Sequence, residues 1–203
     1  MKHSAILIAS AALLAATGAH AQVTGSLGGG SGTFLALSSV GLNGGSIATL
    51  SGGTVYTADK PFADIPAGVI FDGNFLAAGP TSGAPATLSF TGLGVNYISF
   101  LWGSPDLYNA LTVTTTGGVT TTFNTTQLGF AVTDGNQSFS QYVQFLATGG
   151  SKITALTFDN LPGQDAFESA NYSISSVPEP ETYALLLAGL GAIGFVARRR
   201  RRG

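Results

Sequence analysis

Four side chains suited to carbohydrate recognition lie within eight positions near the middle of the chain: Trp102, Asp106, Tyr108 and Asn109. An aromatic face stacks on the C–H groups of a sugar ring, and carboxylate and amide groups exchange hydrogen bonds with its hydroxyl groups. These four residues are therefore candidates for glycan binding. A structural interpretation is favoured over that role, because buried tryptophan is common and a turn fixed by Pro105 and capped by Asn109 explains the rest.

Acidic residues offer a second kind of chemistry. A glycosidase needs two carboxyl groups with different pKa values on either side of the scissile bond. Glu168 is the only glutamate before the C-terminal tail, and the Asp-Gly or Asp-Asn pairs at Asp72, Asp134 and Asp159 are typical of turns. A weak carboxylate-dependent hydrolase therefore remains only a second alternative.

Histidine and cysteine chemistry is excluded by composition. The chain has no cysteine, and its two histidines, His3 and His20, fall within a predicted signal peptide. Ser-His-Asp and Cys-His catalysis, and zinc sites built on imidazole or thiolate, are thereby ruled out in the mature domain. Asp134 and Asn136 offer oxygen ligands for calcium, but no glutamate follows at the EF-hand distance. We expect no enzyme activity, no catalytic residue, no cofactor and no metal.

The charge balance limits the partners. Lys60 and Lys152 are the only basic residues between Gln22 and Val177, where eight acidic residues leave a net charge of −6. Nucleic-acid binding is not expected, because it requires lysine and arginine to neutralise phosphates. Any glycan ligand is expected to be neutral or cationic, since the acidic domain repels polyanions.

The N-terminus resembles a secretory signal peptide. The first three residues form a positive n-region, residues 6–16 form an apolar run too short to span a bilayer, and Ala19 and Ala21 predict cleavage before Gln22. Residues 1–21 are therefore assigned to export. Residues 22–176 are long enough for one extracellular domain with its own core.

Short β-branched or aromatic runs bounded by Gly, Pro, Asn or Asp predict strands throughout this domain. The clearest runs are residues 86–91, 95–102, 111–116, 119–125, 138–146, 153–158 and 171–176. Gly117-Gly118 separates two of them and suits a type I′ hairpin turn. Helical periodicity is missing from the domain.

These elements predict an all-β fold. Residues 95–102 are apolar on both faces, which is typical of a central strand covered above and below. The number and spacing of the strands favour a two-sheet β-sandwich of jelly-roll type over an up-and-down barrel. Its predicted core contains Ile98, Phe100, Val143, Phe145 and Leu156.

Residues 177–203 form a tail with three parts. The motif at residues 177–181 contains Val177, Pro178, Glu179 and Pro180; an apolar run follows at residues 183–197; and the basic cluster is Arg198, Arg199, Arg200, Arg201 and Arg202. The arginines are expected to stay cytoplasmic, which leaves the domain on the far side of the inner membrane. The apolar run gives roughly 22 Å of helix against about 30 Å of hydrocarbon, so a transient transmembrane helix is predicted.

On these residues the tail resembles the PEP-CTERM sorting domain. The resemblance implies processing by an exosortase, a membrane cysteine protease of Gram-negative bacteria that also make exopolysaccharide. It also implies passage through an inner-membrane intermediate to the cell surface or the extracellular space. An ordinary C-terminal anchor with a stiff Pro-Glu-Pro linker is the alternative.

Residues 97–109 resemble a second pattern, an aromatic strand followed by Trp-Gly-Ser-x-Asp-x-Tyr-Asn, found in a subset of exosortase-dependent surface proteins of unassigned activity. The similarity extends to residues 142–145 and 166–168 and to the closing strand. The chain has Ala170-Asn171 where that pattern often has Asp-Asn, which weakens transfer of an acidic role to this position.

Three functions follow as hypotheses. A structural or adhesive role in the envelope or biofilm leads, because it requires only export, a stable acidic β-domain and a sorting tail. A carbohydrate-binding module that recognises exopolysaccharide is the alternative and requires an exposed Trp102. The hydrolase comes third and requires a carboxylate pair in a cleft.

Overall fold

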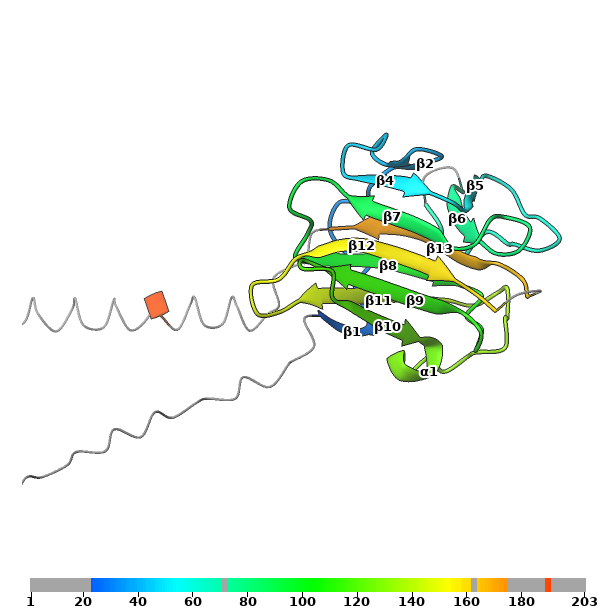
Figure 1. Cartoon of the computed structure of the whole chain (residues 1–203). Helices are drawn as coiled ribbons and strands as arrows, with labels where there is room; N and C mark the ends of the chain where they lie inside the picture. The colour runs from blue at the N-terminus through cyan, green and yellow to red at the C-terminus, as the bar shows by residue number, and fades with distance from the viewer. Residues whose placement is uncertain (1–22, 71–72, 162–163, 175–188, 191–203) are drawn as a thin grey trace, which may run out of the picture.

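The computed structural model describes residues 23–70, 73–161, 164–174 and 189–190, and Figure 1 draws the other residues in grey. The predicted signal peptide, the Pro-Glu-Pro motif and the arginine cluster lie outside the described residues. Within the described ranges, no helix has the length and apolar character needed to cross a membrane.

The described chain is nearly all β and forms two antiparallel sheets (Figure 1). The first has the order β1-β11-β8-β13-β6-β5, with bounds Val23–Leu27 (β1), Ser140–Ala147 (β11), Tyr97–Gly103 (β8), Phe167–Ser173 (β13), Phe75–Ala78 (β6) and Thr54–Tyr56 (β5). The second has the order β10-β9-β12-β7-β4-β3-β2, with bounds Thr120–Asn124 (β10), Ala110–Thr115 (β9), Ile153–Asp159 (β12), Ala86–Phe90 (β7), Ala48–Ser51 (β4), Gly41–Leu42 (β3) and Leu37–Ser38 (β2).

Aromatic side chains join the two sheets. Phe100 of β8 in the first sheet meets Phe158 of β12 in the second edge to face, with ring centroids 5.4 Å apart. Phe100 also contacts Trp102, Phe145 and Tyr172 within its own sheet. The main hydrophobic cluster therefore lies between the sheets and draws on both of them.

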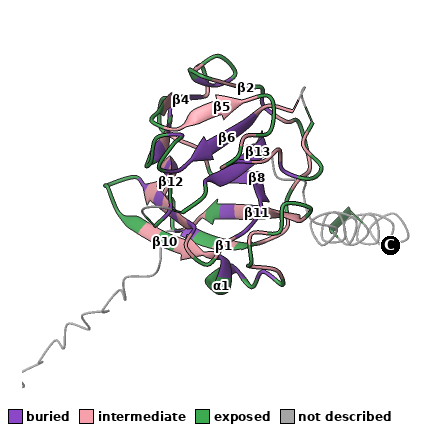
Figure 2. Cartoon of the chain, turned by 90° about the vertical axis from the view of Figure 1, so that its right-hand side faces the viewer, coloured by how far each residue is buried: buried purple, intermediate pink, exposed green. Residues whose placement is uncertain are grey.

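A smaller cluster covers the other face of the first sheet. It combines Phe75, Ala77 and Ala170 from β6 and β13 with side chains of the β5–β6 loop such as Phe62 and Ile65. As a result, the middle of this sheet is buried on both faces, and Figure 2 shows β6, β8 and β13 in the colour of buried residues.

Several sequence predictions are confirmed. β8 lies between β11 and β13, and all seven of its residues are buried, as expected for a central strand. The five predicted core residues are fully buried. Gly117 and Gly118, with φ of 85° and 77°, connect β9 to β10 as the hairpin prediction required.

The structure corrects other predictions. The last strand begins at Phe167, earlier than the predicted residues 171–176, and β5 and β6 were not predicted. A short helix, α1 (Thr125–Leu128), follows β10, because the Asn124 side chain accepts from the Gln127 N–H while the Gln127 side chain accepts from the Asn124 N–H. This capping box ends the strand at Asn124.

The two ends of the domain differ. β1 begins and β13 ends at the left of Figure 1, beside the first residues of β8. The β8–β9, α1–β11 and β12–β13 loops gather at the opposite end, where the β5–β6 loop joins them. The chain therefore enters and leaves the domain away from its main group of loops.

We predict that Phe100→Ala lowers the free energy of unfolding by about 3–5 kcal/mol, because it leaves a cavity between the sheets. Leu93→Ala is the matched control, since Leu93 is 81% exposed and its truncation should cost within about 0.5 kcal/mol. Urea unfolding followed by tryptophan fluorescence measures both. Equal losses in the two variants would contradict the assigned core.

Candidate functional site

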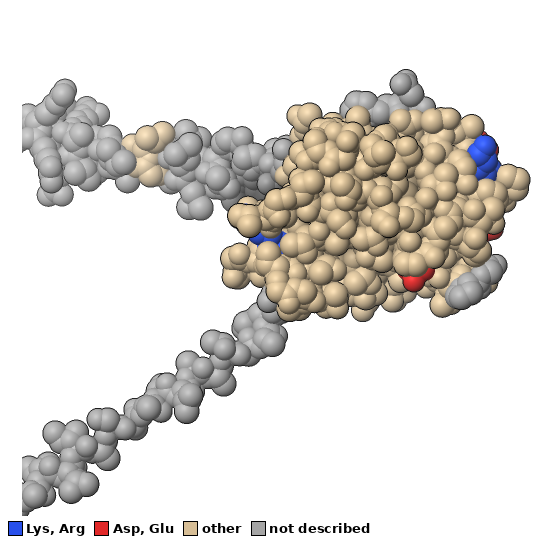
Figure 3. Space-filling view, turned by 45° about the horizontal axis from the view of Figure 1, so that its top comes forward, with Lys and Arg blue, Asp and Glu red and all other residues tan. Residues whose placement is uncertain are grey.

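A pocket of about 140 Å³ lies among the loops at the end of the domain away from Val23 and Ile174. Of the described residues that line it, none is lysine or arginine and five are acidic: Asp64, Asp106, Asp134, Asp165 and Glu168. Figure 3 shows how sparse charged side chains are elsewhere on one face of the domain. The acidic pocket, as we name this site, is therefore a marked concentration of charge.

The two lysines of the domain lie outside the lining of the acidic pocket, and each contacts another side chain. Lys60 Nζ lies 5.4 Å from the centre of the Tyr56 ring. Lys152 directly precedes β12, which begins at the opposite end of the domain (Figure 1), and its Nζ donates to Asn96 Oδ1 at 2.6 Å. Neither lysine lines the acidic pocket.

Strand pairing places Glu168 beside the β8–β9 loop. Glu168 is opposite Gly103 across the β13–β8 ladder. A Cβ at Gly103 would lie 2.8 Å from the Pro66 ring and 3.1 Å from Glu168 Cβ, so only glycine permits this approach. An isolated bridge between Asp106 and Asp134 brings the α1–β11 loop to the same place.

Asn109 fixes the turn that carries Asp106. Its Oδ1 accepts from the Asp106 backbone N–H at 2.9 Å and from Trp102 Nε1 at 3.4 Å. Asn109 is 1% exposed. Its role in the structure is therefore the turn cap that the structural interpretation predicted.

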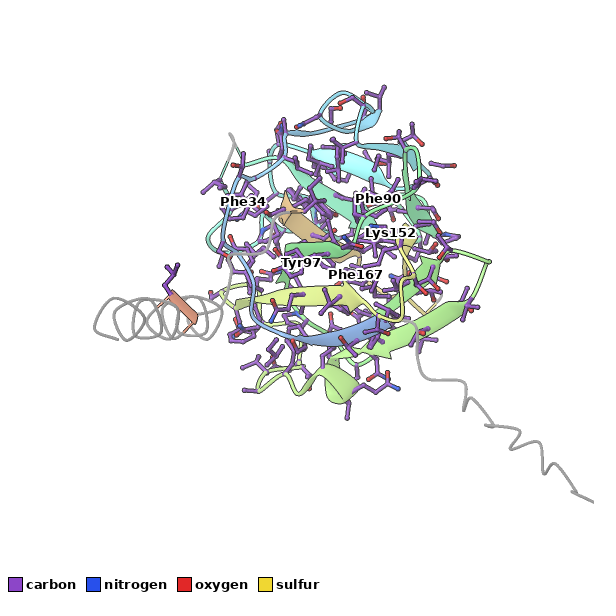
Figure 4. All side chains as sticks on the ribbon, turned by 90° about the vertical axis from the view of Figure 1, so that its left-hand side faces the viewer. Phe34, Phe90, Tyr97, Lys152 and Phe167 are labelled. Atoms are coloured by element: carbon purple, nitrogen blue, oxygen red, sulfur yellow. The ribbon has the colours of Figure 1, made fainter. Side chains whose placement is uncertain are left out.

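Trp102 is fully buried, which corrects the sugar-stacking role considered for it. Its ring stacks on Phe167 at 4.1 Å between centroids and meets Phe130 at 5.3 Å. The view in Figure 4 labels Phe167, its closest ring partner. No face of the indole is open to a sugar.

Asp106 and Tyr108 do reach the pocket, and both are half-buried. Burial raises the pKa of each group. A hydrogen bond between the two side chains raises the pKa of the Tyr108 phenol further and lowers the pKa of the Asp106 carboxyl group. Of the four candidate glycan-binding residues, the structure thus brings two to the pocket and places two in the interior. A ligand role for Asp106 and Tyr108 stays a prediction.

Glu168 is the most perturbed acid of the site. It is 3% exposed, and burial raises its pKa to about 9; Asp64 and Asp106 add to the rise, and backbone hydrogen bonds oppose it. The carboxyl group is therefore mostly protonated at neutral pH. Its Oε2 has no hydrogen-bond partner among the described residues, and neither has the buried Ser104 Oγ in the same lining.

Desolvation and mutual repulsion also act on Asp64, whose pKa is raised by burial and by the charges of Asp59 and Asp165. The acids nevertheless do not converge on one point. In the described part of the chain, no group of three or more His, Cys, Asp or Glu side chains is arranged to hold a metal ion.

Sequence reasoning missed the pocket because four segments that lie far apart in the chain contribute to it. Asp64, Asp165 and Ser104 carry no local signal of a site. Glu168 did carry one, since it is a single glutamate next to the apolar pair Ala166-Phe167 at the start of a strand, a context that predicts burial.

Comparison with known proteins concerns the tail. Residues 176–202 match the family described as the PEP-CTERM protein-sorting motif. The match supports an exported protein that is processed at the membrane by an exosortase and then located at the surface. The roles predicted for individual residues of the tail stay predictions. No curated protein and no solved structure matches the chain.

We predict that Glu168 makes stability fall with rising pH. Its pKa is raised from 4.5 to about 9 in the folded state, so the native protein holds a proton that the unfolded chain releases within that window, and stability is lost as the pH rises through it. Glu168→Gln stays neutral and should remove this loss.

Urea unfolding at several pH values between these limits measures the difference between Glu168→Gln and the unaltered protein. Asp159→Asn serves as a control, because Asp159 is exposed and does not line the pocket. Parallel pH profiles for the unaltered protein and Glu168→Gln would show that Glu168 is not held neutral.

Proposed function

We propose that this chain is a non-catalytic surface protein that an exosortase-type protease sorts to the outside of a Gram-negative cell, where its β-domain has a structural or adhesive role in the envelope or biofilm. One observation carries the proposal: the sorting motif begins at residue 176, two residues after Ile174, which follows the last strand β13. The domain is thus joined to its sorting signal with almost no linker.

The route to the surface uses both ends of the chain. The signal peptide at residues 1–21 directs export and is removed before Gln22. The apolar run then halts in the inner membrane with its arginines in the cytoplasm. This holds Pro178-Glu179-Pro180 at the outer face, where an extended Pro-Glu-Pro segment suits a protease groove.

The geometry of the domain supports display. The last strand ends at one end of the sheets, while the acidic pocket lies at the other. A protein held through residues 175–182 therefore presents its loops away from the membrane. An adhesive surface benefits from this direction because the loops meet the surroundings first.

Membership of the Trp-Gly-Ser subset is part of the proposal. The three segments that carry the resemblance are neighbours in one sheet, because Gly103 of β8 pairs with Ser140 of β11 and with Glu168 of β13. A shared arrangement of Trp102, Asn109 and Glu168 would account for the pattern. The two-sheet architecture further supports a jelly-roll-like sandwich.

Absence of catalysis is inferred from side-chain chemistry. The domain after residue 22 contains neither histidine nor cysteine. Glu168 lies nearly out of contact with solvent and keeps its proton at neutral pH, so it is poorly placed to exchange one with a substrate. Carbohydrate binding is the second candidate, because the acidic pocket contains partly exposed Asp106 and Tyr108.

Replacing Pro178-Glu179-Pro180 by three alanines is predicted to trap the full-length protein in the inner membrane, because the protease loses its recognition segment while the apolar run and arginines remain. Cell fractionation with immunoblotting measures location and size. Leu93→Ala, which alters an exposed side chain in the domain, should reach the surface normally. If the alanine variant reaches the surface at the normal mature mass, the tail is only an anchor.

A further inference from the structure

We propose that the acidic pocket binds a primary ammonium group carried on a sugar ring, so that this end of the domain recognises an amino-sugar glycan. The proposal deepens the carbohydrate-binding candidate by naming its residues and its ligand chemistry. It is independent of sorting, because the pocket is built by residues 61–168 and does not use the tail.

Unsatisfied polar atoms in the lining point to a ligand. Glu168 is 3% exposed and Ser104 is 6% exposed, and both line the pocket. Glu168 Oε2 and Ser104 Oγ have no hydrogen-bond partner among the described residues. Buried polar atoms are nearly always paired in folded proteins, so two unpaired oxygens on residues of one pocket lining point to a polar molecule bound beside them.

The charge of the lining selects a cation. Asp64, Asp106, Asp134 and Asp165 line the pocket together with Glu168, and the lining has no basic side chain. Burial is the main cause of the raised pKa values of Asp64 and Asp106, and the negative charge of Asp165, which also lines the pocket, raises both further. A positive charge on the ligand relieves the repulsion between these charges and makes charge-assisted hydrogen bonds.

Spacing favours an ammonium group over a metal ion. Calcium requires several oxygen ligands at about 2.3–2.6 Å around one point, and the described carboxylates are not arranged in that way. An ammonium group instead donates up to three hydrogen bonds, each of about 2.7–2.9 Å, to separate acceptors. It therefore suits carboxylates that come from different loops.

Size and aromatic lining favour a sugar as the carrier. The pocket of about 140 Å³ is lined by Phe62 and Tyr108, both half-buried. A cavity of about this volume admits one six-membered ring. Aromatic rings give the C–H groups of a sugar a contact surface, while the half-buried Asp106 and the exposed Asp134 offer carboxylate oxygens to its amine and hydroxyl groups.

Isothermal titration of the full chain in detergent, at about pH 6 where the amine is protonated, tests the proposal. A β-1,4-linked glucosamine tetramer should bind, and its N-acetylated counterpart, which has the same linkage without the charge, should bind at least about tenfold more weakly, a difference of 1.4 kcal/mol. Asp134→Asn should weaken binding of the glucosamine tetramer by a similar factor. Because Asp134 is exposed, this substitution leaves the packing of the core unchanged.

Asp159→Asn is the matched control, because it removes the same charge from a residue outside the lining; it should leave binding of the glucosamine tetramer unchanged. Four results would overturn the proposal: no binding of this tetramer, equal binding of the N-acetylated form, equal binding of tetralysine, or displacement of the sugar by calcium alone. If the glucosamine tetramer does not bind, the sorting proposal is unaffected. If the tail proves not to be a sorting signal, the binding proposal is unaffected.

Discussion

Burial of aromatic side chains between the two sheets is the interaction on which the rest of the structure depends. The chain has no cysteine to form a disulfide, and the two lysines of the domain can neutralise few of its acids. Phe100 meets Phe158 across the sheets and contacts Trp102, Phe145 and Tyr172 in its own sheet. Since hydrophobic burial is the dominant favourable contribution to folding, this cluster stabilises the domain and holds β8 and β13 in register.

The acidic pocket is a consequence of that register. β13 contributes Phe167 to the aromatic cluster and the next residue, Glu168, to the pocket, because successive side chains of a strand point to opposite faces. Packing of Phe167 against Trp102 therefore also places Glu168 beside Gly103 and under the β5–β6 loop. There the carboxyl group loses water, which raises its pKa to about 9. One pair of adjacent strands thus links the stability of the core to the chemistry of the site.

Local patterns predicted the middle of the fold better than its edges. Residues 86–158 contain β-branched and aromatic runs between glycines, and the strands β7 to β12 were predicted there within a few residues. β5 and β6 were not predicted, because these short segments, of which β6 is rich in alanine, gain stability only from pairing with other strands. Asp106 and Tyr108, which the sequence named as candidate ligand-binding residues, line the acidic pocket. The burial of Trp102 depends on Phe130 and Phe167, which no local pattern brings together. The capping box at Asn124 was readable as Asn-x-x-Gln but lay inside a predicted strand.

The described domain and the matched tail support a protein that is exported, processed at the membrane and located at the surface, and we propose that its loops are directed outward there. Central to this proposal is the removal of the tail during delivery. Intact-mass spectrometry of the protein recovered from the cell surface tests this most directly, because one spectrum locates both ends. The account predicts a chain that begins at Gln22 and lacks residues 183–203. A surface protein whose mass includes the sequence through Arg202 and Gly203 would contradict it.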